Sequence, residues 1–404
     1  MFAGIDIASE RHVMVRLDDQ GLPIGKPTPI TEDHEGHARL LDLLGPVPVL
    51  VTMEATGHYW KNLFVVLTAA GHKVAVLNPY QARRFQDANM ERTKTDAIDA
   101  AGLARLAFEK RPAPTDVPDA VAGELRELVR HRDRLRQDFD DRVRQLHRLV
   151  DLGFPEFTRI VQGLDTMLAT CLLAEYPTAH AFARGTPRRI AKLVYDGRHK
   201  VGDERARRLV ETAKRSVGQH HGHADAVQAR HLCQDLDLWR RRLSDIERDI
   251  GTRLERHEVG ALLPSIDGIG PQTAARIIAA VGDPARFKSP EAFAAYVGAI
   301  PCLRQSGKNS GRSRAPIGIL GNARLRKALW MPVLSAVGRN PWLRTFYERL
   351  IAAGKPPKLA IIAAMRKLLH AIYSVAKNRK PFEIRPAPAA PAPSAPMLPT
   401  LQPQ

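Results

Sequence analysis

Cysteine is scarce in this chain of 404 residues, which contains three. Cys171, Cys233 and Cys302 lie far apart and are odd in number, so they form neither a disulfide framework nor a CxxC metal pair. This excludes a disulfide-stapled secreted domain and favours a reducing compartment.

Long apolar segments are also missing. The first residues, MFAGIDIASE, lack the basic region and the apolar core of a signal peptide. No uninterrupted apolar run reaches the roughly 18 residues that a membrane span needs. We therefore expect a soluble cytoplasmic protein without a membrane partner.

Acidic residues are almost absent from one part of the chain. Residues 300–380 contain 17 Lys and Arg and a single acid, Glu348, whereas the whole chain has 61 basic and 43 acidic residues and a net charge of +18. Such a concentrated positive field favours a polyanionic partner, nucleic acid first and an acidic membrane surface second.

The N-terminal part predicts strands and helices in the order βββαβαβα. Strands are expected at residues 2–8, 12–18, 25–31, 47–55 and 72–78, and helices at 33–45, 57–71 and 79–88. Gly25, Pro27 and Pro29 weaken the third strand, which should therefore lie at an edge. Residues 1–112 thus predict an α/β domain with a mixed sheet.

From residue 118 the apolar residues follow heptad-like spacing. One series is Val121, Leu125, Leu128, Leu135, Phe139, Val143, Leu146 and Val150, interrupted by Arg132, and the other is Leu232, Leu236, Trp239, Leu243, Ile246, Ile250 and Leu254. This spacing predicts two long helices that form an antiparallel coiled coil within 118–257. Residues 153–220 between them are interpreted as a shorter helical insertion. Pairing within one chain and dimerisation through the seam are equally consistent with the pattern.

The remaining sequence predicts two further parts. Residues 258–382 form a mostly helical and strongly basic unit. Residues 383–404 contain seven prolines in 22 residues and are expected to be a disordered tail.

Four acidic residues stand at positions that predict a shared site. Asp6 lies within an apolar strand, where an unpaired charge is costly. Glu54 ends the strand VLVTME, at the edge where open α/β sheets bind ligands. Asp96 and Asp99 are three residues apart and share a helical face. Each residue has an ordinary alternative, as a turn residue, a strand end or a helix cap after Thr95.

If that helix packs across the sheet, the four carboxylates converge and would repel one another. Two Mg²⁺ ions about 3.5–4 Å apart would hold them together and clamp both oxygens of a phosphodiester displacement. The order Asp, Glu, Asp-x-x-Asp on this framework resembles a RuvC-like member of the RNase H-like fold.

Two motifs in the basic half are candidates for contacts with nucleic acid. The turn Gly268-Ile269-Gly270 before Pro271 could aim backbone N–H groups at a phosphate, as in helix-hairpin-helix elements, or could be an ordinary connection. The acid-free stretch 296–318 is either a solvated loop that touches phosphates or the position of a nucleophilic serine, which the local residues leave open among Ser306, Ser310 and Ser313. The residues predicted to bind nucleic acid are Gly268, Gly270, Arg304, Lys308, Arg312, Arg314, Arg324, Arg326 and Lys327.

A histidine-rich stretch lies near the end of the insertion. His220, His221 and His223 have only Asp225 as a nearby fourth ligand, so the stretch is interpreted as a loop rather than a zinc or nickel site.

Taken together, these motifs resemble the IS110 family of insertion-sequence transposases. The similarity is carried by GIDIA, MEATGHY, KTDAIDA, IDGIG and AAYVGAIPCLRQSGKNSGRS, and it extends from residue 1 to about 382. It implies a DEDD-type recombinase with a RuvC-like N-terminal domain, a coiled-coil linker and a C-terminal transposase domain. It also implies Mg²⁺, homodimers or homotetramers with active sites shared between subunits, donor and target DNA, and a structured non-coding RNA that pairs with both.

The family's serine becomes covalently joined to DNA and stands in a Pro-x4-Ser-Gly context. Pro301 to Ser306-Gly307 fits that context, so the resemblance selects Ser306, with Ser310 as second choice. We therefore expect a transposase, cytoplasmic and associated with the nucleoid, with Asp6, Glu54, Asp96 and Asp99 as metal ligands. Two alternatives remain: a RuvC-like junction-resolving nuclease that uses water as nucleophile, and an inactive nucleic-acid-binding scaffold.

Overall fold

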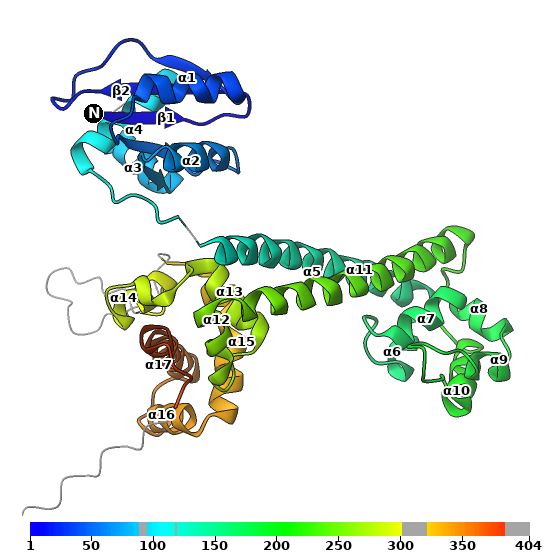
Figure 1. The fold of residues 1–404 in the computed structure, drawn as a ribbon. Helices are drawn as coiled ribbons and strands as arrows, with labels where there is room; N and C mark the ends of the chain where they lie inside the picture. Colours follow the sequence, from blue (N-terminus) through cyan, green and yellow to red (C-terminus); the bar gives the residue numbers. More distant parts are fainter. Residues whose placement is uncertain (89–94, 118, 301–320, 384–404) are drawn as a thin grey trace, which may run out of the picture. The chain divides into compact units, whose positions relative to one another are not determined.

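The computed structural model describes residues 1–88, 95–117, 119–300 and 321–383. The chain divides into two units, Met1–Val117 and Pro118–Gln404, each with its own internal contacts (Figure 1). Each unit is described by itself.

The N-terminal unit is built on a five-stranded mixed sheet in the order β3-β2-β1-β4-β5. Its strands are β1 (Phe2–Asp6), β2 (Arg11–Leu17), β3 (Thr28–Thr31), β4 (Leu50–Glu54) and β5 (Lys73–Leu77). β1 pairs antiparallel with β2 and parallel with β4, and β4 is parallel to β5. β3 is short and lies at the edge, as its glycine and prolines predict.

Helices cover both faces of this sheet, because the side chains of each strand alternate between two apolar cores. Ala3 and Ile5 pack with Leu40 of α1 (His34–Leu44) and Leu63 of α2 (Trp60–Ala69). Phe2 and Val15 point to the other face, where α4 (Asp96–Lys110) packs. α3 (Pro79–Ala88) contacts α4. The predicted βββαβαβα order and the mixed sheet are confirmed.

The second unit contains two long helices, α5 (Ala120–Gly153) and α11 (His223–Glu255), which pack along one another (Figure 1). Ion pairs show that they run antiparallel: Arg253 meets Glu124, Arg132 meets Glu247, and Arg142 meets Asp235. The break in the apolar series at Arg132 is explained by its partner, since its guanidinium lies 2.7 Å from Glu247 Oε1.

A small helical module joins the end of α5 to the start of α11. It contains α6 (Phe157–Ile160), α7 (Met167–Glu175), α8 (Ala179–Arg184), α9 (Pro187–Ala191) and α10 (Asp203–Ala213). Phe154, Phe157 and Phe182 form its aromatic core, with ring centroids 5.5 to 5.9 Å apart.

The two ends of this module touch. The backbone N–H groups of Gln219 and His220 donate to Leu152 O, at 3.0 and 3.2 Å. A Cβ added to Gly218 would lie 2.5 Å from Gly153 O, so only glycine fits there.

The rest of the unit is a helical bundle. It comprises α12 (Glu258–Leu262), α13 (Pro271–Val281), α14 (Pro290–Val297), α15 (Ala323–Arg339), α16 (Pro341–Ala352) and α17 (Pro357–Asn378), with the 3-10 turns Leu263–Ser265 and Pro284–Arg286. Among the described residues, α17 is the helix that is long and apolar enough to cross a membrane by length and composition. Arg366 and Lys367 interrupt it, and much of it is buried inside this bundle.

Candidate active site

Two carboxylates end neighbouring parallel strands. Asp6 is the last residue of β1 and Glu54 the last of β4. The register pairs Ile5 with Met53, so the two acidic residues stand level at the carboxyl edge of the sheet. Because side chains alternate along a strand, Asp6 and Glu54 point to the same face as Phe2 and Thr52, which is the face that α4 covers.

Helix α4 lies directly on this face. A Cβ on Gly4 would lie 2.2 Å from Ala104 N and 2.3 Å from Ala100 O, so the backbone of the helix rests on the strand where there is no side chain. The buried Thr52 hydroxyl lies 2.6 Å from Leu103 O and fixes the helix to β4 with a hydrogen bond. These two contacts position α4 relative to the two strand ends.

The first turn of α4 supplies the other two carboxylates. Thr95 caps the helix by accepting a hydrogen bond from Ile98 N at 3.3 Å. Asp96 and Asp99 follow in the first turn, where the helix dipole favours negative charge. They precede Ala100 and Leu103 on the side of the helix that meets the sheet, so their carboxylates are directed toward the strand ends.

The four charges act on one another. Burial raises the pKa of Asp6 to about 6, and the carboxylates of Asp99, Asp96 and Glu54 add to that rise, whereas a hydrogen bond from the Ile7 N–H lowers it. Asp6 is partly buried and Asp96 is exposed. The site therefore stores electrostatic repulsion that a bound cation would relieve.

A hard divalent cation fits the chemistry of this donor set, because all four side chains offer carboxylate oxygens. In the part of the chain that the structure describes, however, no three His, Cys, Asp or Glu side chains are arranged to hold a metal as they stand. Occupying the site thus requires the carboxylates to turn toward a common point. His220 and His221 lie in the connection before α11, whereas His223 is the first residue of that helix, so the interpretation of the stretch as a loop is wrong for His223.

Hydrogen bonds fix the neighbourhood of both strand ends. Thr56 Oγ1 lies 3.0 Å from Glu54 Oε1 and orients that carboxylate. Ala8 N donates to Nδ1 of the fully buried His12, at 3.2 Å, which holds the chain just after Asp6. Nε2 of His12 in turn contacts Glu32 at 2.8 Å.

Glu32 connects β2, α1 and α2 through its hydrogen bonds. It also accepts hydrogen bonds from His37 and Asn62. Burial would raise the pKa of Glu32, but the hydrogen bonds from His12, His37 and Asn62 lower it to about 2. The roles of Gly4, Thr52 and this network were not predicted from the sequence. For Gly4 a signal was available, because a glycine inside a strand often marks a close approach of another backbone.

Most of the acid-free stretch 296–318, which contains the three candidate serines, lies outside the described residues. This applies to Ser306, Ser310, Ser313, Arg304, Lys308, Arg312 and Arg314.

The three predicted cations that follow residue 320 lie at the start of α15. Arg324 and Lys327 are exposed, whereas Arg326 donates to Val297 O at 3.1 Å and so also anchors the end of α14.

The two glycines before α13 differ in their surroundings. Gly268 has a φ of +93°, and a Cβ there would lie 2.5 Å from Ala336 Cβ of α15, so its close packing alone requires glycine. Gly270 is exposed and is the N-cap of α13, where its position leaves room for a ligand.

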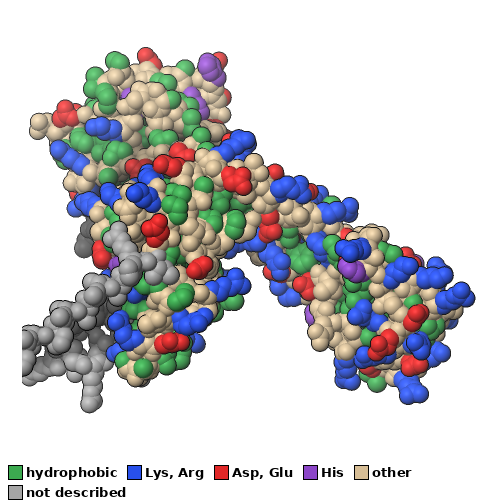
Figure 2. Space-filling view, turned by 60° about the horizontal axis from the view of Figure 1, so that its bottom comes forward, with side chains coloured by type: hydrophobic (Ala, Val, Ile, Leu, Met, Phe, Trp, Pro, Cys, Tyr) green, Lys and Arg blue, Asp and Glu red, His purple; other side chains and the backbone are tan. Residues whose placement is uncertain are grey.

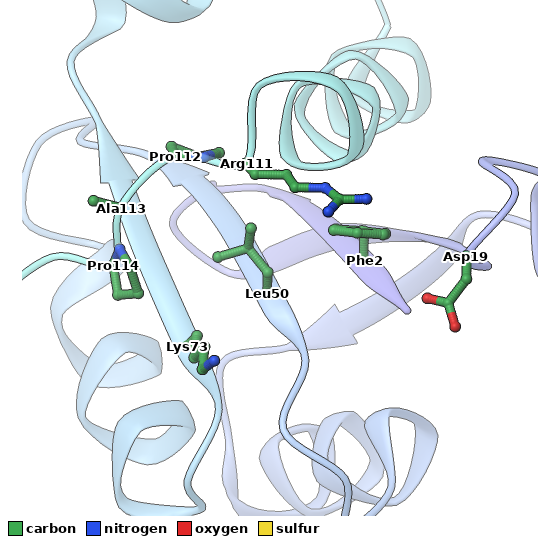
Figure 3. Close-up of a pocket in the computed structure, with 8 residues that line it drawn as sticks. All are labelled: Phe2, Asp19, Leu50, Lys73, Arg111, Pro112, Ala113 and Pro114. Carbon is green, nitrogen blue, oxygen red and sulfur yellow. The ribbon is translucent and has the colours of Figure 1, made fainter.

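A shallow pocket of about 440 Å³ lies at the amino ends of β1, β4 and β5 (Figure 3). Phe2, Leu50 and Lys73 line it from the strands, and the Arg111 guanidinium lies over the Phe2 ring, 5.7 Å from its centroid. It is at the opposite end of the strands from Asp6 and Glu54, so it is not part of the carboxylate site.

Two sequence models of transposases match this chain. One, described as a transposase of the DEDD IS110 type, matches residues 3–155 and therefore includes all four carboxylates. The other, described as the IS116/IS110/IS902 family of transposases, matches residues 260–348.

Full-length relatives are similar over nearly the whole chain. An uncharacterized 43.6 kDa protein of insertion element IS110 from Streptomyces coelicolor is 26% identical over 397 residues, covering 95% of this chain and 96% of the relative. A putative transposase of the IS117 mini-circle from the same organism is 27% identical, covering 95% of each chain. The pilin gene-inverting protein of Moraxella bovis is 28% identical, covering 82% of this chain and 81% of the relative.

Proposed function

Because this chain belongs to the IS110 family of transposases and is therefore an enzyme of DNA strand transfer, we propose that it exchanges DNA strands through Asp6, Glu54, Asp96 and Asp99 together with Ser306. The observation that supports the proposal is the placement of four carboxylates at the ends of β1 and β4 and in the first turn of α4, where burial first and then the other three carboxylates raise the pKa of Asp6. A protein that gathers four like charges at the carboxyl edge of a sheet needs a cationic ligand to offset them.

Each residue has a distinct role in this proposal. Asp6 and Glu54 would hold a divalent cation from the strand ends, and Asp96 and Asp99 would hold it from the helix. We propose that the metal is Mg²⁺ and that two ions bind. They would stabilise charge on the attacking and leaving oxygens. The N-terminal unit is thus proposed to be RNase H-like, of the RuvC type.

Ser306 is the proposed nucleophile. Its hydroxyl loses a proton and forms an O–P bond while the bond from phosphorus to one deoxyribose oxygen breaks, and that oxygen takes up a proton. Attack by the hydroxyl of a new strand end reverses these steps and releases the serine. Arg304, Lys308, Arg312 and Arg314 are proposed to stabilise charge on the phosphoryl oxygens.

The wider architecture belongs to the same proposal. We assign α5 and α11 to a coiled coil within 118–257, and 258–382 to a transposase domain whose Gly268, Gly270, Arg324, Arg326 and Lys327 contact nucleic acid. The protein acts in the cytoplasm on the nucleoid as a homodimer or homotetramer, with a structured RNA that pairs with donor and target DNA. The gene-inverting relative supports inversion as a further outcome of the same strand exchange.

Trapping the covalent intermediate tests the proposal. Purified protein is incubated with donor DNA, RNA from the element and Mg²⁺, and then denatured. We expect a protein–DNA adduct that is lost in Ser306→Ala and kept in Ser310→Ala. Cleavage without any adduct would instead identify the nuclease that uses water, and an adduct at full yield in Ser306→Ala would refute the assignment of the serine.

A further inference from the structure

A short segment of the helical module carries basic side chains with hardly any acidic ones. Between residues 184 and 200 there is a single acid, Asp196, and the cations are Arg184, Arg188, Arg189, Lys192, Arg198 and Lys200. All six are exposed. We call residues 184–200 the basic segment. Figure 2 shows Lys and Arg side chains gathered over the surface of the module.

The single acid does not neutralise these cations. Its Oδ1 accepts hydrogen bonds from the backbone N–H groups of Arg198 and His199, at 3.0 and 2.6 Å, and its Oδ2 lies 2.7 Å from His199 Nδ1. Asp196 thereby shapes the turn that presents Arg198, between bridge partners Val194 and Lys200. Within the described part of the chain, no ion pair involves any of the six cations.

Many arginines of the neighbouring helix pair are matched with acids. Arg132, Arg136 and Arg142, for example, each lie within ion-pair distance of an acid on α5 or α11. A soluble surface requires only that charges of both signs be mixed. Arg188 and Lys192 lie four residues apart at the end of α9, and like charges at this spacing repel each other. Among the described residues, no carboxylate lies within ion-pair distance of the six cations to offset this repulsion.

We propose that the basic segment binds the phosphate backbone of duplex DNA, at a site separate from the four carboxylates and from the acid-free stretch 296–318. Arginine suits this role because its planar guanidinium can donate two hydrogen bonds to one phosphate. Duplex DNA is the occupant because the enzyme transfers DNA strands. Contacts to phosphates alone carry no sequence preference, so this site adds affinity and orientation rather than recognition.

The module is well placed to make an additional contact. The C-terminal bundle meets α5 at Asp133, which pairs with Arg276, whereas the module begins after Gly153. Twenty residues of helix separate these points by about 30 Å, close to one turn of B-DNA. A duplex that spans these two points could contact the module and the bundle without contacting the ion-paired arginines between them.

The test compares two variants of the full-length protein with equal charge changes. The first replaces Arg184, Arg188, Arg189 and Arg198 with Gln. The matched control replaces Arg130, Arg136, Arg144 and Arg248 with Gln, which are exposed arginines of the helix pair that lie in ion pairs. Binding of a fluorescent duplex of arbitrary sequence is measured by anisotropy in EDTA over a range of salt concentrations.

The binding constant K falls as the salt concentration rises. We expect the slope of log K against log salt to be less steep by about 3 to 4 in the first variant, because each lost phosphate contact removes about 0.9 from its magnitude. The control should change it by less than about 1. Single variants Arg188→Gln and Arg198→Gln, with unaltered circular dichroism, should each remove about 0.9 and so exclude misfolding as the cause.

Two results would overturn the proposal. One is an equal change in slope for both fourfold variants, which would mean that net charge alone matters. The other is a selective loss with duplex RNA or with phosphatidylserine vesicles while DNA binding is unchanged. Neither result depends on Ser306 or the carboxylates, so the proposed function is tested separately.

Discussion

The carboxylate site and the helix pair treat charge in opposite ways. The N-terminal unit brings four like charges to the edge of one sheet, where burial, together with the carboxylates of Asp99, Asp96 and Glu54, raises the pKa of Asp6 to about 6. The helix pair matches unlike charges across its length, with Arg132 against Glu247 and Arg142 against Asp235. Matched charges stabilise the fold, whereas like charges held together against their repulsion are what the proposed cation site requires.

The largest effect should come from neutralising the repelling charges. Asp6→Asn and Asp99→Asn each remove the negative charge of one carboxylate that is proposed to bind the metal. We therefore expect strand transfer to fall by about 10³-fold or more. Binding of duplex DNA should stay within about twofold, because phosphate contacts come from the basic residues. Gel assays of strand transfer and anisotropy on the same samples measure both. Near-normal transfer in both variants would refute a role of these residues in metal binding.

The next effect concerns the close approach of α4 to the sheet. Gly4→Ala places a methyl group against the backbone of Ala100 and Ala104, so we expect the N-terminal unit to lose about 3 kcal/mol or more of unfolding free energy, together with strand transfer. Gly123→Ala in α5 is the matched control, because no atom lies within 4 Å of its added Cβ, and it should stabilise the helix by up to about 1 kcal/mol. Urea unfolding compares the two variants, and equal stability would contradict the tight packing at Gly4.

A third prediction concerns stability against pH. The pKa of Asp6 is raised in the folded protein to about 6, so the folded state binds this proton more tightly than the unfolded state. Without metal, stability should fall as the pH rises from about 4 to 6, and the loss is complete above that range. A shift of about two pKa units corresponds to about 3 kcal/mol.

Asp6→Asn should therefore be more stable than the unaltered protein at pH 8 and show no such fall. Thermal unfolding in EDTA at pH 5 and pH 8 measures this. If both proteins respond identically to pH, repulsion at Asp6 is not a significant term in stability.

The smallest effect should come from the helix pair. A double-mutant cycle on Arg132→Ala and Glu247→Ala is expected to give a coupling of about 1 kcal/mol or less, since both side chains are partly exposed to water. Strand transfer should survive at a temperature where both variants are folded. A coupling well above that value would show that matched charges here contribute more than surface pairs do.

The order of strands and helices was predictable because it follows from local periodicity. Short runs of apolar residues identified β1 and β4, and heptad spacing identified α5 and α11. The shared face of Asp96 and Asp99 also followed from spacing alone, because three residues make nearly one helical turn.

Contacts between distant residues were not predictable in this way. Arg132 looked like a break in its helix until Glu247, 115 residues away, was seen opposite it. Gly4 and Thr52 likewise position α4 through atoms about 50 to 100 residues away in the sequence, which no local pattern reveals. The direction from which α4 approaches the sheet is set by contacts between residues that are far apart in the sequence.

The touching ends of the helical module have one more consequence. Because Leu152 O receives both Gln219 and His220, the chain leaves the long helices and returns to them at neighbouring residues. Helix α7 also packs against α11, where Arg240 donates to Asp165 O, so this part of the module supports the long helix from the side. A change of length elsewhere between Gly153 and Gly218 would leave the pairing of Arg132 with Glu247 in place, whereas a change in α7 would alter the surface that α11 packs against.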